Sequence, residues 1–171
     1  LVRTENSELR INALLEEVDL LAGVGPAELR DAPVSLTLRA DDLDLRELRR
    51  MLPPVDFLDG RVDLDLAASG TFGNLDISRL RLAHGRTDLR LAGALGNLDR
   101  PEELFIAAKV TESSIAGDDV MFLLKGLDLP DLTPLGVSTL NLEYEGKPLD
   151  FTAKFHLETE AGTVSSPGFA M

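Results

Sequence analysis

Apolar and polar residues alternate with a period of two along much of this chain, and this pattern limits the fold more than any other feature. Successive side chains of a β-strand point to opposite faces of its sheet, so the alternation predicts strands with one apolar face and one wet face. It places strands at 34–40, 60–70, 87–95, 104–110 and 136–146. The clearest strand follows Pro148, where Leu149, Phe151, Ala153, Phe155 and Leu157 alternate with Asp150, Thr152, Lys154, His156 and Glu158.

A second feature is a repeated layout with a constant offset of 76 residues. The matched positions are Pro54 and Pro130, Gly60 and Gly136, and Gly70 and Gly146. Self-similarity at a fixed spacing is typical of continuous architectures in which each unit relies on its neighbours to bury its apolar face. We therefore expect residues 1–171 to be a single segment of a longer β-repeat array, with units at about 42–117 and 118–171 and a partial unit at 1–41.

Two short helices and one irregularity are expected between the strands. A helical apolar stripe begins at Asp44 and is ended by Pro53-Pro54, while the segment VMFLLKG from Val120 is apolar nearly all round. This predicts helices near 44–52 and 119–125, the second of them buried or in contact with apolar material. The apolar phase changes between Ile77 and Leu80, which predicts a β-bulge near Ser78-Arg79.

The first fifteen residues have two interpretations. Their similarity to residues 82–95 favours a strand end, a turn at Glu5-Asn6 and the start of a second strand. Helical spacing of Leu14, Leu15, Val18 and Leu21 before Gly23 favours a helix instead.

Composition argues against several classes of function. The formal net charge is −13, from 30 acidic and 17 basic residues, so we expect no nucleic-acid partner and no attraction to an anionic membrane surface. The absence of cysteine excludes disulfides, thiolate metal sites and Cys nucleophiles. No apolar run approaches the roughly 18 residues of a membrane-spanning helix.

Candidate catalytic groups are few. We expect His84 in a hairpin turn and His156 on the polar face of a strand, both as solvated surface residues. The Ser-rich spots Ser113-Ser114 and Ser165-Ser166 lack the pattern of a nucleophile elbow, so we expect them at turns or strand ends.

Two acidic pairs, Asp41-Asp42 and Asp118-Asp119, lack the spacing of a calcium-binding loop. Each precedes a predicted helix, which favours a role in capping that helix. Together these patterns predict a chain that is not an enzyme and has no cofactor and no metal site.

The apolar phase of the strands predicts a leucine-rich face. A single sheet cannot leave such a face in water, because each exposed Leu forgoes roughly 1.5–3 kcal/mol of burial. Aromatic residues are only 5% of the chain, and a lining of aliphatic side chains suits flexible acyl chains. A closed hydrophobic core is the alternative. The predicted lining residues are Val62, Leu64, Leu66, Leu89, Leu91, Ile106, Leu140, Leu142, Phe151 and Phe155.

The residues also resemble a known family. An Asp-Leu-x-Leu helix entry, Leu-Pro-Pro, and Leu-x-Gly-x-Val-x-Leu-x-Leu-x-Ala-x-Gly-Thr run from Asp42 through Gly70, followed by Asn-Leu-Asp-Ile at 74–77 and a Gly-turned Leu-x-Leu strand at 80–85. A looser copy covers 118–162. This pattern resembles the AsmA-like/TamB superfamily of bacterial envelope proteins.

The resemblance implies a mainly β fold, an elongated antiparallel sheet curled into a taco-like or β-solenoid groove with an apolar lining. It also implies a periplasmic protein of a Gram-negative-type bacterium, held in the inner membrane by a helix that this chain does not include. The family has no catalytic residues. In its TamB branch the partner is an outer-membrane barrel of the Omp85 type, engaged by a C-terminal region that is not recognisable here.

The expected function is therefore a non-catalytic segment of a periplasm-spanning bridge for phospholipid transport and outer-membrane assembly. Its expected partners are phospholipid acyl chains and neighbouring repeats of the same chain. The alternative is a structural or adhesive β-solenoid with a closed Leu core.

Overall fold

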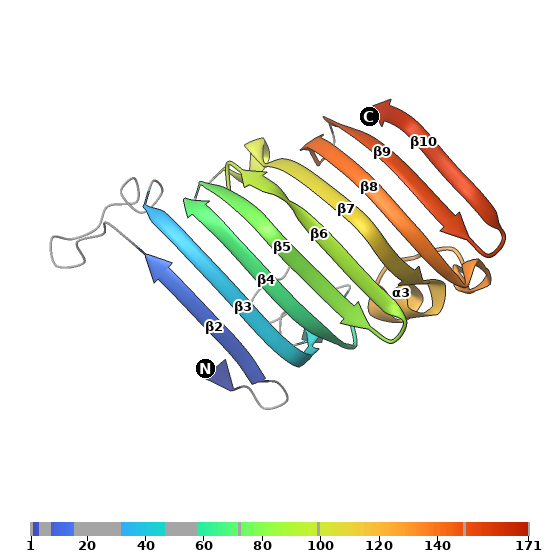
Figure 1. The fold of residues 1–171 in the computed structure, drawn as a ribbon, viewed down its shortest axis with the longest axis horizontal. Helices are drawn as coiled ribbons and strands as arrows, with labels where there is room; N and C mark the ends of the chain where they lie inside the picture. Colours follow the sequence, from blue (N-terminus) through green and yellow to red (C-terminus); the bar gives the residue numbers. More distant parts are fainter. Residues whose placement is uncertain are drawn as a thin grey trace, which may run out of the picture.

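The described strands pair in the order of the sequence to form one antiparallel sheet of ten strands (Figure 1). The computed structural model describes residues 2–3, 8–15, 32–46, 58–71, 73–98, 100–148 and 150–170. The strands are β1 (Val2–Arg3), β2 (Glu8–Leu15), β3 (Pro33–Asp44), β4 (Arg61–Thr71), β5 (Asn74–His84), β6 (Thr87–Gly96), β7 (Phe105–Ala116), β8 (Val137–Lys147), β9 (Asp150–Thr159) and β10 (Gly162–Ala170).

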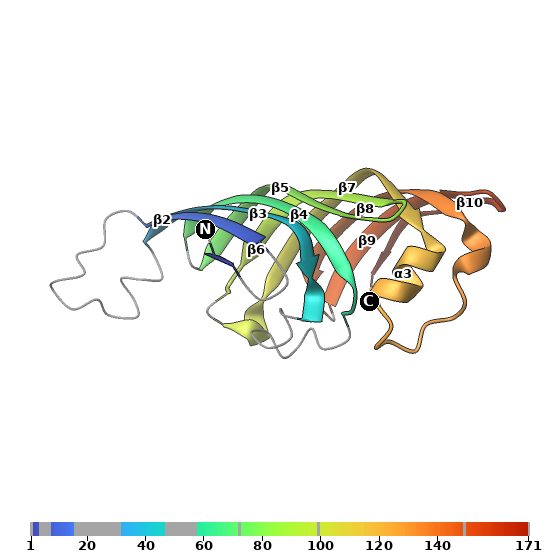
Figure 2. The ribbon, with the colours of Figure 1, turned by 90° about the horizontal axis from the view of Figure 1, so that it is seen from below.

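The mainly β, antiparallel architecture is thus confirmed. The sheet is open, because its described strands run from an edge at β1 to an edge at β10. It is gently arched, and the helix α3 (Gly117–Leu123) lies on its inner side (Figure 2). The strong curl of a taco-like groove is not seen within these strands.

The cross-strand register assigns one phase of every strand to one face. Leu66 lies opposite Leu38 of β3 and Leu80 of β5. Four strands further along, Leu142 lies opposite Val110 of β7 and Phe155 of β9. A one-residue slip would move a whole strand's apolar set to the other face, so burial of one face fixes this register.

Bulges keep the leucines in phase. The predicted bulge near Ser78-Arg79 is confirmed, because the pairing of β5 with β6 shifts between Ile77 and Leu80. Without this shift, Leu80 and Leu82 would point to the polar face. Further shifts occur between Ala40 and Leu43 in β3.

The helix expected near 119–125 is present as α3, beginning two residues earlier. Most of the helix expected at 44–52 lies outside the described residues. Asp44 is the last residue of β3, and its Oδ1 accepts a hydrogen bond from the Arg46 amide at 3.0 Å, as a capping carboxylate does. Short 3-10 turns, η2 (Pro101–Glu103) and η3 (Thr133–Leu135), complete the described elements. Within these segments, no helix has the length and apolar character to cross a membrane.

The N-terminal segment follows the strand interpretation, since β1 and β2 occupy Val2–Arg3 and Glu8–Leu15. The turn predicted at Glu5-Asn6, and Val18 and Leu21 of the competing helix, lie outside the described residues. Leu14 and Leu15 belong to β2.

The glycines that match at a 76-residue offset have similar backbones. Gly60 and Gly136 have φ of 88° and 61°, and Gly70 and Gly146 have φ of 137° and 139°. At Gly70 a Cβ would lie 2.3 Å from the Asn74 carbonyl oxygen, so the turn into β5 requires glycine. The repeat units themselves stay a prediction.

Candidate functional site

The leucine-rich face is the inner face of the arch. All ten residues predicted to line a groove belong to it, because the register pairs them with one another or with other apolar residues of the same phase. Val62 is buried, with 2% of its surface exposed. The other nine are half-buried. The face is therefore packed at one place and partly open elsewhere.

The face is larger than the predicted set. Leu36 and Leu38 of β3, Leu80 and Leu82 of β5, and Leu157 of β9 occupy the same phase. The alternation in the sequence already carried this signal for each of these strands. What joins the strands into one surface is the register, which depends on pairing between segments far apart in the chain.

One end of the face carries aromatic rings. Tyr144 and Phe151, on neighbouring strands β8 and β9, stack with ring centroids 4.7 Å apart and planes inclined by 23°. The Tyr144 hydroxyl donates a hydrogen bond to the Lys147 carbonyl at 2.9 Å. Because the hydroxyl is satisfied at the strand end, the ring adds apolar surface to the face without burying an unpaired polar group.

The helix α3 covers the opposite part of the face. Leu123 packs in a buried cluster with four residues from the other side of the sheet order: Ala40 and Leu43 of β3, Leu45 just after β3, and Val62 of β4. These residues are far from Leu123 in the sequence. The backbone fixes this contact too, since the Asp59 amide donates to the Leu123 carbonyl at 2.8 Å. The leucine-rich face is thus closed where α3 packs on it.

Phe122 of α3 is only partly packed. Its ring stacks on that of His84, with centroids 5.4 Å apart and planes inclined by 8°, and 52% of the residue is exposed. His84 Nδ1 lies 2.6 Å from the Arg61 carbonyl, which can only accept, so this nitrogen donates. His84 lies at the hairpin turn as expected, and it is half-buried because the helix covers one side of its ring.

Two aspartates anchor α3 to the β5–β6 hairpin. Asp119 Oδ2 accepts hydrogen bonds from the Arg86 amide at 2.8 Å, the Thr87 amide at 2.9 Å and the Thr87 hydroxyl at 3.0 Å. The Arg86 guanidinium contacts both oxygens of Asp118 at 2.9 Å and holds the pKa of that carboxyl below its usual range. The N-cap residue Ala116 makes no side-chain capping bond, but hydrogen bonds from the first-turn amides of Asp118 and Asp119 help to lower the pKa of the Asp118 carboxyl. The role predicted at the start of the helix is therefore met in part by Asp118, which also binds the hairpin, whereas the Asp119 carboxylate binds the hairpin.

The prediction for Asp41-Asp42 is wrong. These residues lie in β3 at a register shift, and Asp42 has a left-handed backbone with φ of 58°. The Asp42 carboxylate pairs with Arg61 on β4, while its amide donates to Asp63 at 2.9 Å. Asp and Asn tolerate this backbone better than other side chains, which explains an aspartate at the bulge.

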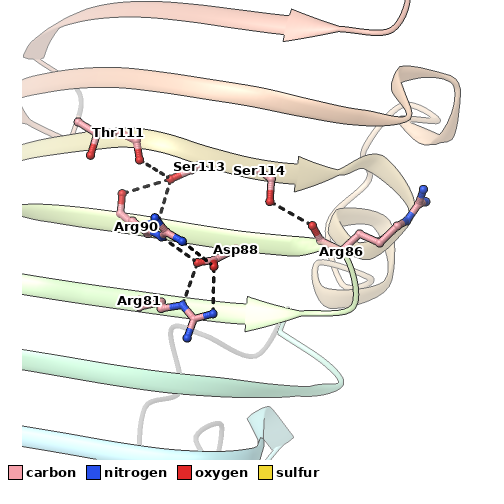
Figure 3. A network of polar contacts seen from close by, with 7 residues as sticks. All are labelled: Arg81, Arg86, Asp88, Arg90, Thr111, Ser113 and Ser114. Carbon is pink, nitrogen blue, oxygen red and sulfur yellow. Dashed lines mark hydrogen bonds and ion pairs between the residues drawn. The ribbon is translucent and has the colours of Figure 1, made fainter.

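Ser113 is a polar residue whose role the sequence did not indicate. We expected a turn or strand end, but Ser113 is inside β7 and has 0% of its surface exposed. Its hydroxyl accepts a hydrogen bond from the Arg90 amide at 2.8 Å, where the pairing of β7 shifts (Figure 3). The shift leaves this amide without a strand partner, and the hydroxyl replaces the missing carbonyl.

The outer face carries ion pairs between side chains of neighbouring strands. Lys109, Glu143 and Lys154 lie opposite one another on β7, β8 and β9, and the amines lie 3.2 and 4.0 Å from Glu143. Asp65 forms ion pairs with Arg39 of β3 at 3.4 Å and with Arg79 of β5 at 2.9 Å. Shallow hollows between such side chains lie on this polar face.

Asp88 on this face is held by two arginines. Arg81 approaches it at 3.0 and 2.9 Å and Arg90 at 3.4 and 3.1 Å, from the two sides (Figure 3). Hydrogen bonds from Arg81, and then from Arg90, lower the pKa of Asp88 to about 2. The carboxylate therefore stays ionised throughout the physiological range.

The described residues contain no group of three or more His, Asp or Glu side chains arranged to hold a metal ion. His156 forms a 3.2 Å pair with Glu158 on the outer face, and its side chain is 44% exposed, as expected for a surface residue. The feature that distinguishes this sheet chemically is its apolar inner face. Comparison of the chain with protein-family models, with curated proteins and with solved structures found no match.

Proposed function

We propose that the leucine-rich face binds the acyl chains of phospholipids, as a non-catalytic segment of a longer lipid-conducting bridge. The observation that carries this proposal is that the leucine-rich face is continuous across the strands and yet partly exposed to solvent. Leu64, Leu91 and Leu142 lie on one inner face that runs across the strands, yet each is half-buried. Partly exposed aliphatic side chains gain free energy when an apolar ligand covers them.

Acyl chains fit this surface better than a rigid ligand. Directional recognition needs polar groups that converge on a ligand, and the register places aliphatic residues opposite one another on this face. Flexible chains need only a wide apolar surface. In the proposed setting, the array continues beyond these strands, curls more strongly, and lies in the bacterial periplasm with an anchor and an outer-membrane partner supplied elsewhere.

Native mass spectrometry of the protein, purified after exposure to phosphatidylcholine vesicles, tests the proposal. We expect retained phospholipid, and its loss in the Leu142→Asp variant, because a carboxylate on the face repels acyl chains. The matched variant Asn141→Asp places the same charge on the neighbouring residue of the outer face and should retain lipid. Absence of lipid from the parent protein would favour the alternative, a structural solenoid whose leucines form a closed core.

A further inference from the structure

We propose that the leucine-rich face selects phospholipids with a zwitterionic head group over phospholipids with a net negative head group. This inference rests on the proposed function, since a head group reaches the protein only when its acyl chains lie on the face. A charged head group cannot enter aliphatic surface, so it must lie at a margin of the sheet.

The margin beside α3 is where apolar surface meets charge. Here β4 and β6 begin at Arg61 and Thr87, β7 ends at Ala116, and α3 packs beneath them. Phe122 extends apolar surface to this margin with half of its area exposed. An acyl chain that lies along the strands beside α3, in contact with the exposed Phe122, would place its head group among the charges of the α3 margin.

The described arginines of the α3 margin, Arg46, Arg61 and Arg86, are already bound. Arg46 donates to both oxygens of Asp44 at 2.9 and 2.7 Å. Arg86 makes two 2.9 Å contacts with Asp118, and Arg61 pairs with Asp42. A guanidinium that binds phosphate usually does so with two parallel hydrogen bonds. Among the described residues, an anionic head group must therefore break one of these pairs before it finds an arginine of this margin.

Acidic groups are in excess among the described residues of the same margin. Asp128, Asp131 and Glu160 are exposed, and the described ion pairs include no cation for them. Glu160 belongs here because its carboxylate lies against Gly136, at the start of β8. Lys125, which follows α3, is exposed and takes part in none of the described ion pairs. One amine among several carboxylates suits a phosphate that carries its own ammonium group, whereas a net negative lipid meets repulsion.

The selectivity is tested with the complete chain and vesicles that contain equal amounts of phosphatidylcholine and phosphatidylglycerol. Native mass spectrometry gives the ratio of the two lipids retained. At about 50 mM salt we expect a three- to tenfold excess of phosphatidylcholine, falling toward equality at about 500 mM because salt screens the repulsion. An equal ratio, or an excess of phosphatidylglycerol, at low salt would overturn the inference and leave the proposed function standing. Retention of neither lipid would overturn both.

Two variants separate the bound arginines from the overall charge. Asp118→Asn frees Arg86, whereas Asp128→Asn removes the same charge from the same margin and frees no described partner. We expect Asp118→Asn to raise the retained share of phosphatidylglycerol at least threefold above that of Asp128→Asn. Equal shares would show that the bound arginines do not set the selectivity. If Asp118→Asn loses its β-sheet circular dichroism, Asp42→Asn makes the same comparison by freeing Arg61 at a left-handed position that Asn accepts.

Discussion

Aspartate substitutions on the leucine-rich face distinguish a packed core from an open surface. Val62 has 2% of its surface exposed and packs in the cluster with Leu43 and Leu123. A carboxylate there loses its hydration without gaining a partner, which costs about 3–5 kcal/mol. This is a large part of the roughly 5–15 kcal/mol that stabilises a typical domain.

The same substitution at Leu142 should cost much less. Leu142 is half-buried between Val110 and Phe155, so an Asp side chain there reaches water. The loss is then the apolar contact of the leucine, about 1–2 kcal/mol. We therefore expect Val62→Asp to lower the free energy of unfolding by about 1–4 kcal/mol more than Leu142→Asp.

The measurement is urea unfolding followed by the far-ultraviolet circular dichroism of the β-sheet, since the chain has no Trp and a single Tyr. Val62→Ala and Leu142→Ala serve as controls for the loss of side-chain volume without a new charge. Equal destabilisation by the two aspartates, of about 3 kcal/mol or more, would refute the reasoning. It would mean that water reaches Leu142 no better than it reaches Val62, and that the face is closed.

Three further predictions concern the supporting structure. Asp119→Ala should lower the free energy of unfolding by about 2–3 kcal/mol in the same urea assay, because three hairpin donors lose a charged acceptor; a change below about 0.5 kcal/mol would contradict the anchoring role. Gly93→Ala would place a Cβ 2.0 Å from a backbone oxygen of the neighbouring strand, whereas the nearest atom at Gly96 is 3.2 Å away, so calorimetry should show a lower Tm for Gly93→Ala than for Gly96→Ala. The pKa of Asp88 is lowered to about 2 from its ordinary value of 3.8, so the stabilisation by its ion pairs is complete above about pH 4 and is lost as the pH falls toward 2. Its side chain is 25% exposed, so we expect Asp88→Asn to cost about 1–2 kcal/mol at pH 7 and little at pH 2; a cost that did not vary with pH would exclude this ion pair as its cause.

The sequence by itself determined the strands, their faces and one irregularity. The phase change between Ile77 and Leu80 predicted the bulge that the sheet contains. Period-two alternation reports which face each side chain takes, and this depends only on the local backbone. For the same reason the apolar phase of each strand, and with it the ten predicted lining residues, could be read before any coordinates, whereas the register joined these phases into one face.

Only the tertiary structure decided how segments distant in the chain meet. It places Leu123 on Val62, binds Asp119 to the hairpin instead of its own helix, and gives Ser113 a backbone amide to satisfy. Nothing in the local pattern distinguishes an aspartate that caps a helix from one that binds a turn, because both positions follow the same sequence preferences. The gentle arch was likewise decided by the packing of neighbouring strands and of α3, since curvature sums small twists and bulges over the whole sheet.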